Sequence, residues 1–275
     1  ETFKGCTALS SISWSQFIKD VGTSAFEGCT ALTSVSFPLS VENIGDYAFK
    51  GCTGIKQLNM QEGLKTIGTG AFQGCSAMEQ IGIPNSVETI GSSAFENCTA
   101  ATSISFPQKS GGNFKEINPF TFQGCTSVTR VDIPDTVNII GRMAFKGCSA
   151  LKLVDIPSSV NTIGEEAFQS IASGAWIFVD KADVSLGRDA LGNTGIIFGY
   201  RDSNVSKYCE SHTGTTFVSW NIYNFVKRHY DYLWGTGKVT DEKATFGADA
   251  VALWNRTLTG SGLVDKLISH KNFTD

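Results

Sequence analysis

A five-residue motif, Ala-Phe-x-Gly-Cys, returns along the first part of the chain at a fixed interval. Its phenylalanine recurs every 23 residues, with a single longer interval of 27 between Phe95 and Phe122. The complete and degenerate copies place this residue at Phe3, Phe26, Phe49, Phe72, Phe95, Phe122, Phe145 and Phe168. A fixed period of this length is typical of a solenoid, in which each repeat packs only on its neighbours. The repeat therefore constrains the fold more than any other feature.

Each repeat contains one stretch with the alternating pattern of a strand. In the repeat that begins at Leu32, Val35 and Phe37 alternate with polar residues. The equivalent pairs are Ile12/Trp14, Leu58/Met60, Ile81/Ile83, Ile104/Phe106, Val131/Ile133, Val154/Ile156 and Ile177/Val179. A proline follows in five repeats and ends the strand, because proline has no backbone donor. We therefore expect a right-handed solenoid with a parallel sheet on one face, and a surface loop at 108–114, where the longer repeat holds its four extra residues.

Two rows of glycine flank the repeated phenylalanine, one on each side of it in the sequence. The first row is Gly22, Gly45, Gly68, Gly91, Gly141 and Gly164, and Thr, Asp or Ser often follows it, which indicates the start of a short helical turn. The second row is Gly5, Gly28, Gly51, Gly74, Gly124 and Gly147, with Asn97 in one repeat. Because Asn is the usual substitute for Gly where φ is positive, the second row predicts a left-handed residue that ends the turn. The repeat is thus expected to be of the α/β class.

Seven of the eight cysteines occupy one phase of the repeat. They are Cys6, Cys29, Cys52, Cys75, Cys98, Cys125 and Cys148. A metal site needs paired ligands at short spacing, and no Cys-x-x-Cys occurs in the sequence. One cysteine per repeat instead indicates a row of small apolar thiols in the shared core. We expect these thiols to be free and buried, leaving at most Cys209 reactive.

Composition excludes several classes of function. Charged residues make up 17% of the chain and the net charge is −4, which argues against nucleic-acid binding. No apolar run approaches 18 residues, so no transmembrane segment is expected. The chain begins with Glu1 inside a repeat, which is expected of a processed or cut chain whose signal peptide lies upstream.

The repeat resembles the BspA-like leucine-rich repeats of bacterial surface proteins. That pattern, Leu-x-x-Ile-x-Ile-Pro-x-Ser-Val-x-x-Ile-Gly-x-x-Ala-Phe-x-x-Cys, is matched from Glu1 to Phe168, with Gln61 in place of one proline. The resemblance implies a leucine-rich-repeat solenoid over 1–180, with its sheet on the concave face. It also implies an extracellular or cell-surface location in bacteria and a role in adhesion.

The remainder of the chain differs from the repeats. Residues 181–220 are expected to cap the solenoid, and 196–218 predicts a strand, a short helix and a strand, similar to the closing segment of the same family. Apolar residues at helical spacing then predict a short α-helical domain over 221–275. This region partly resembles a small bacterial domain of unknown function found in secreted and surface-layer proteins. The Leu-Gly-Arg element of that domain is missing, and the domain is expected to be incomplete.

No arrangement of residues in the sequence supports catalysis. Cys209 and His212 form a lone Cys-x-x-His, which one turn of a capping helix explains better than a metal or a catalytic dyad. Asp132 and Asp155 occupy the same strand position in successive repeats, as a glycosidase pair could, but a solvated row of outward residues explains them better. We therefore expect no enzyme activity, no metal and no cofactor.

Two classes of function remain. In the first, a monomeric interaction module binds a protein or a glycan through the outward residues of its concave face. The residues expected to contact the ligand are Gln57, Asn59, Gln80, Arg130, Asp132 and Asp155. In the second, the solenoid is a passive stalk that displays or anchors the C-terminal domain. Aromatic anchors on the concave face would favour the first class, and an evenly polar face would favour the second.

Overall fold

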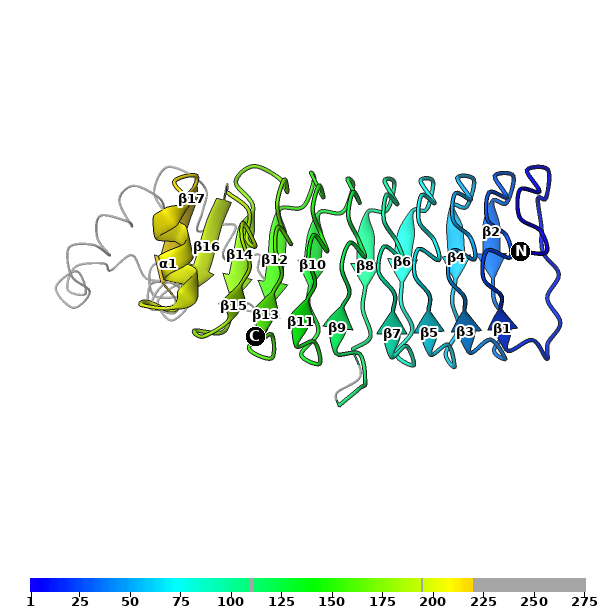
Figure 1. The fold of residues 1–275 in the computed structure, drawn as a ribbon, viewed down its shortest axis with the longest axis horizontal. Helices are drawn as coiled ribbons and strands as arrows, with labels where there is room; N and C mark the ends of the chain where they lie inside the picture. Colours follow the sequence, from blue (N-terminus) through cyan, green and yellow to red (C-terminus); the bar gives the residue numbers. More distant parts are fainter. Residues whose placement is uncertain (109–110, 194, 220–275) are drawn as a thin grey trace, which may run out of the picture. The chain divides into compact units, whose positions relative to one another are not determined.

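The computed structural model describes residues 1–108, 111–193 and 195–219. Over these residues the chain forms about nine coils, placed one after another (Figure 1). We number the coils by the core residue that each contributes at the position of the repeated phenylalanine, from Phe3 in the first to Phe168 in the eighth. Leu191 holds this position in the ninth coil, where it is buried.

Each regular coil contributes two strands. The longer strands are β2 (Ser34–Ser36), β4 (Gln57–Asn59), β6 (Gln80–Gly82), β8 (Ser103–Ser105), β10 (Arg130–Asp132), β12 (Leu153–Ile156), β14 (Trp176–Val179) and β16 (Gly195–Gly199). The shorter strands are β1 (Asp20–Val21), β3 (Asn43–Ile44), β5 (Thr66–Ile67), β7 (Thr89–Ile90), β9 (Glu116–Ile117), β11 (Ile139–Ile140), β13 (Thr162–Ile163) and β15 (Ser185–Leu186). The row of shorter strands was not predicted, although the repeated Ile-Gly pair marks its position in the sequence.

Strands of neighbouring coils pair in parallel and in equivalent register, as Val35 with Leu58 and Ile44 with Ile67. The longer strands form three hydrogen-bonded groups in the described part of the chain, β2-β4, β6-β8 and β10-β12-β14-β16, and the last group is extended by β17 (Thr215–Ser219). The shorter strands form two groups, which separate between β7 and β9. The longer repeat lies at this break, and Figure 1 shows the wider excursion of the chain between β8 and β9. The expected parallel pairing is confirmed, but it is divided into segments.

The core contains a stack of phenylalanine rings, one from each of the first eight coils. Ring centroids of neighbouring coils lie 5.1 Å apart for Phe26 and Phe49 and 5.4 Å apart for Phe49 and Phe72, and the ring planes are nearly parallel. Each ring from Phe49 to Phe168 is fully buried. Since stacked aromatic rings attract each other beyond their area burial, this row of rings links each of the first eight coils to its neighbours in the row.

The cysteines form a second row beside the rings. Each thiol from Cys29 to Cys148 donates to the carbonyl of the phenylalanine one coil earlier, as Cys52 Sγ to Phe26 O at 3.0 Å and Cys75 Sγ to Phe49 O at 3.2 Å. All eight cysteines are free, which confirms the expectation from their spacing. One detail is corrected: Cys6 is exposed and Cys209 is buried, so Cys6 is the accessible thiol.

The segment between the two glycine rows is not helical, so the predicted helical turn, and with it the α/β class of the repeat, is wrong. Ser24 and its equivalents have positive φ, 51° at Ser24 itself. Alternate backbone N–H groups therefore donate to the next coil instead of along a helix. Phe26 N donates to Ala48 O at 2.8 Å, and Gly28 N donates to Lys50 O at 2.7 Å. The coils are thus built from strands and turns, as in a parallel β-solenoid of leucine-rich-repeat type.

The glycine rows serve two different physical needs. In the second row φ is positive throughout, 75° at Gly74 and 60° at Asn97, which confirms the prediction from the Gly-to-Asn exchange. In the first row, from Gly45 to Gly164, the need is close approach. A Cβ on Gly45 would lie 2.8 Å from Thr23 N, and one on Gly91 would lie 2.4 Å from Thr69 N. Neighbouring coils therefore pack backbone to backbone at these positions.

The first coil departs from the prediction at its strand. No strand forms at Ile12 and Trp14. Both side chains line a cavity of about 270 Å³ together with Phe3 and Phe26. The segment around Ile12 and Trp14 therefore forms no strand that pairs with β2, whereas the equivalent segments of later coils form strands.

The regular coil register continues past residue 180, through β15 to the turn at Leu191. It is followed by β16, the helix α1 (Asn204–Ser211) and β17 (Thr215–Ser219), which confirms the predicted strand, helix and strand. Within the described residues α1 is the only helix, and no helix there is long and apolar enough to cross a membrane. The helical domain expected at 221–275 lies outside the described residues.

Candidate functional site

The first candidate site is the outward side of the longer strands, which we call the strand face. Along each longer strand, side chains alternate between the core and this face. In β6, for example, Ile81 is buried while Gln80 and Gly82 are exposed. The exposed outward residues of β2, β4, β6 and β8 are Ser34, Ser36, Gln57, Asn59, Gln80, Gly82, Ser103 and Ser105. Apart from Gly82, this part of the strand face presents an array of neutral polar side chains.

The predicted ligand-contacting residues all lie on the strand face, but their surroundings differ. Gln57, Asn59 and Gln80 are exposed. Farther along the coils, Arg130 and Asp132 are half-buried and form an ion pair, with Arg130 Nε 2.9 Å from Asp132 Oδ1.

The remaining predicted residue, Asp155, lies one coil after Asp132, and the two residues pair in register. Only 8% of Asp155 is exposed. Asp132 is engaged by Arg130, and Asp155 is buried, so the two carboxylates do not form the open pair that glycoside hydrolysis needs. The strand face thus leaves three of the six predicted residues exposed, and among them the Asn59 amide donates to Ser36 Oγ at 3.3 Å.

Sequence reasoning missed a group of aromatic residues on the same face. Trp176 and Phe178 alternate with the core residue Ile177, and Phe198 pairs in register with Phe178. The Phe178 and Phe198 rings stack at 4.4 Å, and Trp176 lies 5.5 Å from Phe198. All three side chains are buried, so they are not part of the exposed array. In the sequence, Trp176 and Phe178 alternate with the core residues Ile177 and Val179. This alternation could have placed the two aromatic residues on the outward side of the strand.

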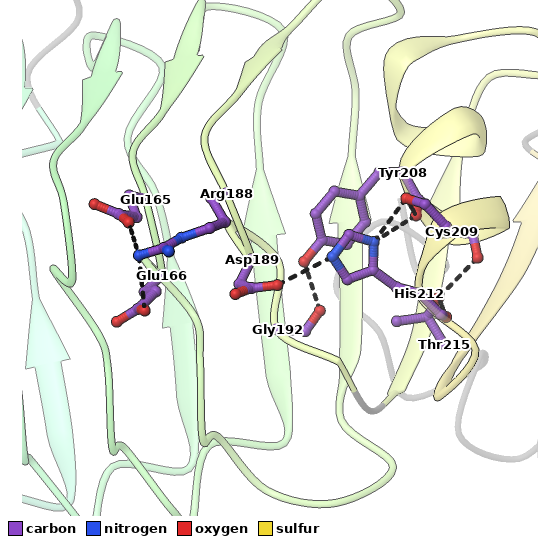
Figure 2. Close-up of polar contacts among 10 residues, drawn as sticks. Glu165, Glu166, Arg188, Asp189, Gly192, Tyr208, Cys209, His212 and Thr215 are labelled. Atoms are coloured by element: carbon purple, nitrogen blue, oxygen red, sulfur yellow. Dashed lines mark hydrogen bonds and ion pairs between the residues drawn. The ribbon is translucent and has the colours of Figure 1, made fainter.

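The second candidate site is the junction between the ninth coil and the cap helix α1, shown in Figure 2. The Tyr208 hydroxyl donates to Gly192 O at 2.6 Å, and the Tyr208 ring stacks on the His212 ring at 3.8 Å. His212 Nδ1 lies 2.7 Å from Tyr208 O, and Nε2 lies 3.2 Å from Asp189 Oδ1. Asp189 comes from the turn of the ninth coil, so these contacts join the helix to the last coil.

The junction does not form a Cys-His dyad. Burial raises the pKa of the Cys209 thiol, which therefore stays protonated at neutral pH. The ring nitrogens of His212 are directed to Tyr208 O and Asp189 instead. His212 is the residue that ends α1, and its backbone N–H donates to Cys209 O. The interpretation of Cys209 and His212 as one turn of a capping helix is confirmed.

A serine-histidine-aspartate arrangement is also present at the junction, with Ser211 Oγ 3.0 Å from His212 Nδ1. In a catalytic triad the serine donates its proton to the histidine. Here the Ser211 hydroxyl donates to Tyr208 O at 2.8 Å, and the same carbonyl lies against His212 Nδ1. These contacts close the last turn of a helix and leave no activated nucleophile. In the described part of the chain, no group of three or more His, Cys, Asp or Glu side chains could hold a metal ion.

Comparison with one solved structure supports the fold, and a second structure aligns less well. A leucine-rich repeat protein from Bacteroides ovatus aligns with a TM-score of 0.62 and 23% identity, over 78% of this chain and 62% of that chain. A leucine-rich cell surface protein from Faecalibacterium prausnitzii aligns with a TM-score of 0.44 and 26% identity, over 68% of this chain and 55% of that one. The chain therefore spans less than two thirds of the length of these structures. A comparison with curated protein sequences gave no match.

The sequence itself matches a described family over most of its length. The BspA type leucine-rich repeat region is matched in six copies, over residues 1–112 and 99–207. These residues carry the repeated strands, the stacked phenylalanines and the cysteine row, and they extend into the cap helix. On this evidence the chain belongs to the BspA-type leucine-rich repeat family.

Proposed function

We propose that the chain is an interaction module of a bacterial surface or secreted protein, which binds a protein or glycan through the exposed part of the strand face. This part of the face has no exposed aromatic anchor, which by itself favours a spacer. The observation that carries the proposal is the change along the face, from the serines of β2 to the exposed amides of Gln57, Asn59 and Gln80. Gln57, Asn59 and Gln80 present amide donors and acceptors side by side on neighbouring coils. Such groups can hydrogen-bond to a peptide backbone or to sugar hydroxyls. Membership in the BspA-type family supports a role at the cell surface.

The composition of the array predicts weak single-site binding. The amide and hydroxyl groups of the array are hydrated before binding, so each hydrogen bond to a ligand contributes only about 0.5–1.5 kcal/mol. The array contains no exposed Tyr, Trp or Arg, which dominate tight interfaces. We expect micromolar or weaker affinity for one copy, with avidity from many copies on a surface.

A structural spacer is the second candidate function. The stacked rings, the thiol-carbonyl bonds and the close backbone contacts at the first glycine row tie every coil to the next. These interactions would serve a stiff support regardless of what its faces bind. In this case the solenoid would display the region that follows it, and the strand face would bind nothing.

A binding screen with two proteins distinguishes the two functions. The intact chain and a variant that ends after residue 219 are tested on glycan arrays and on immobilised matrix proteins. The interaction module predicts the same ligands for both proteins. Binding by the intact chain that is lost in the shortened variant would contradict the proposal and favour the spacer.

A further inference from the structure

A polar pocket lies outside the strand face, at the turns that connect β4, β6 and β8 to the shorter strand of the same coil (Figure 1). Its volume is about 490 Å³, and its lining residues are Glu62, Asn85, Ser86 and Gln108. This volume falls within the range of about 300–1,000 Å³ that is typical of small-molecule sites. Glu62, Asn85 and Gln108 are exposed, so a ligand in solution can reach the pocket.

The lining side chains are held in place by hydrogen bonds between successive coils. The Glu62 carboxylate accepts from two backbone groups of the next turn, Asn85 N at 3.1 Å and Ser86 N at 3.1 Å. Asn85 Oδ1 in turn accepts from Gln108 N at 2.9 Å. A ligand would therefore meet groups that are fixed before it binds, which reduces the entropy cost of association.

This ladder of side chains ends at Gln108. The equivalent residue of the next coil is Asp135, which follows Pro134 as Gln108 follows Pro107, but the longer repeat places it 27 residues on instead of 23. In the part of the chain that the structure describes, the side-chain amide of Gln108 has no hydrogen-bond partner. The end of the ladder thus presents one free amide, which can both donate and accept.

The lining groups match a neutral ligand that is rich in hydroxyl groups. A carboxylate has about four acceptor sites, and the Glu62 carboxylate uses three of them for N–H groups of Asn85 and Ser86, which leaves one for a ligand hydroxyl. A metal ion would have to displace these N–H groups. The carboxylate repels anions, and the described lining residues carry no positive charge to offset it. They also include no apolar side chain that could anchor a peptide.

We propose that this pocket is a saccharide-binding site, in which one sugar hydroxyl donates to Glu62 and another bonds to the Gln108 amide. These two residues lie two coils apart, roughly 10 Å at the spacing of about 4.8 Å between parallel strands, which suits a mono- or disaccharide. A few neutral hydrogen bonds without aromatic stacking give a dissociation constant of about 1 mM or weaker. The proposal does not rest on ligand binding at the strand face, because the pocket is built from turn residues.

Backbone amide chemical shifts of the isotope-labelled full chain test the site directly. The chain is titrated with glucose, galactose, N-acetylglucosamine and lactose to about 100 mM, well above the expected dissociation constant. We expect at least one of these sugars to shift the amides of Asn85, Ser86 and Gln108 saturably. Gln108→Ala should weaken this binding roughly two- to tenfold, the loss expected for one neutral hydrogen bond. Gln80→Ala removes the same side chain from the strand face and should leave the affinity unchanged.

Four outcomes would overturn the proposal. The first is the absence of saturable shifts at these amides with all four sugars. The second is unchanged affinity in Gln108→Ala, a variant that should fold because its side chain takes no part in the ladder. The third is equal weakening by Gln80→Ala, which would place the sugar on the strand face. The fourth is tighter binding of trilysine than of any sugar at the same amides, which would assign the Glu62 carboxylate to a basic peptide.

Discussion

Removal of one ring from the middle of the phenylalanine stack should destabilise the solenoid by several kcal/mol. Phe72 is fully buried and stacks on Phe49 and on Phe95, at 5.4 Å in each case. Burial of a Phe side chain contributes about 1.5–3 kcal/mol, and each stacked pair adds about 0.5–1.5 kcal/mol. We therefore expect Phe72→Ala to lower the free energy of unfolding by about 3–5 kcal/mol, the usual range for a packed core phenylalanine.

Phe3→Ala is the matched control for this prediction. Phe3 belongs to the same row, but it is 42% exposed and stacks on a single ring, that of Phe26. The same reasoning gives a loss of about 1–3 kcal/mol for Phe3→Ala, with half of the burial and one stacked pair. Urea unfolding followed by circular dichroism measures both variants against the wild-type chain. Equal losses at Phe72 and Phe3, or a loss below about 1 kcal/mol at Phe72, would refute the account of the core.

Three further predictions follow from the glycine and cysteine rows. Gly74→Val should destabilise the chain by more than about 1 kcal/mol because a β-branched residue resists the φ of 75° at this position, whereas Gly82→Ala, with open space at its Cβ, should have little effect in the same urea assay. Thiol titration of the native chain should modify Cys6 rapidly and Cys75 only after unfolding; fast labelling of Cys75 would contradict the buried row. Burial raises the pKa of Cys52 to about 12, so this thiol stabilises the fold below the pKa of an unfolded thiol, about 8.5, and the stabilisation is lost as the pH rises toward 12. Between pH 9 and pH 11, the free energy of unfolding should therefore fall with pH less steeply in Cys52→Ala than in the wild-type chain, by about 1.4 kcal/mol per pH unit. The same slope in both proteins would show that the Cys52 thiol is not shielded from solvent.

The sequence predicted those features of the fold that repeat. The spacing of the phenylalanines and the cysteines was sufficient to predict the coils, the core and the free thiols, because equivalent residues of a solenoid must stack. The presence of Asn97 where other repeats have Gly was sufficient to predict the positive φ of the second glycine row. These are local or periodic properties that the sequence carries directly.

The features that were missed depend on how neighbouring coils meet. A glycine followed by Thr or Asp is equally compatible with a helix start and with the turn at Ser24, and hydrogen bonds to the next coil decide between them. The row of shorter strands has only two residues in each coil, too few for an alternating pattern to be visible.

The candidate sites were predictable to different degrees. The positions of the outward residues followed from alternation, but their exposure did not, because Asp155 is buried while Gln57 is open to solvent. The contact of His212 with Asp189 joins residues 23 apart through the coil geometry, and no sequence motif marks it.

The most direct test of the proposed function compares two sets of substitutions on different strand rows. The first is the triple variant Gln57→Ala, Asn59→Ala and Gln80→Ala, and the second, the control, is Thr66→Ala, Thr89→Ala and Thr162→Ala on the shorter strands. Affinity for the ligand found by the screen is measured by calorimetry or by surface binding. Loss of three hydrogen-bonding groups of about 0.5–1.5 kcal/mol each should weaken binding about tenfold or more in the first variant and leave the second unchanged. Equal affinity of the first variant and the wild-type chain would contradict the assignment of binding to the strand face.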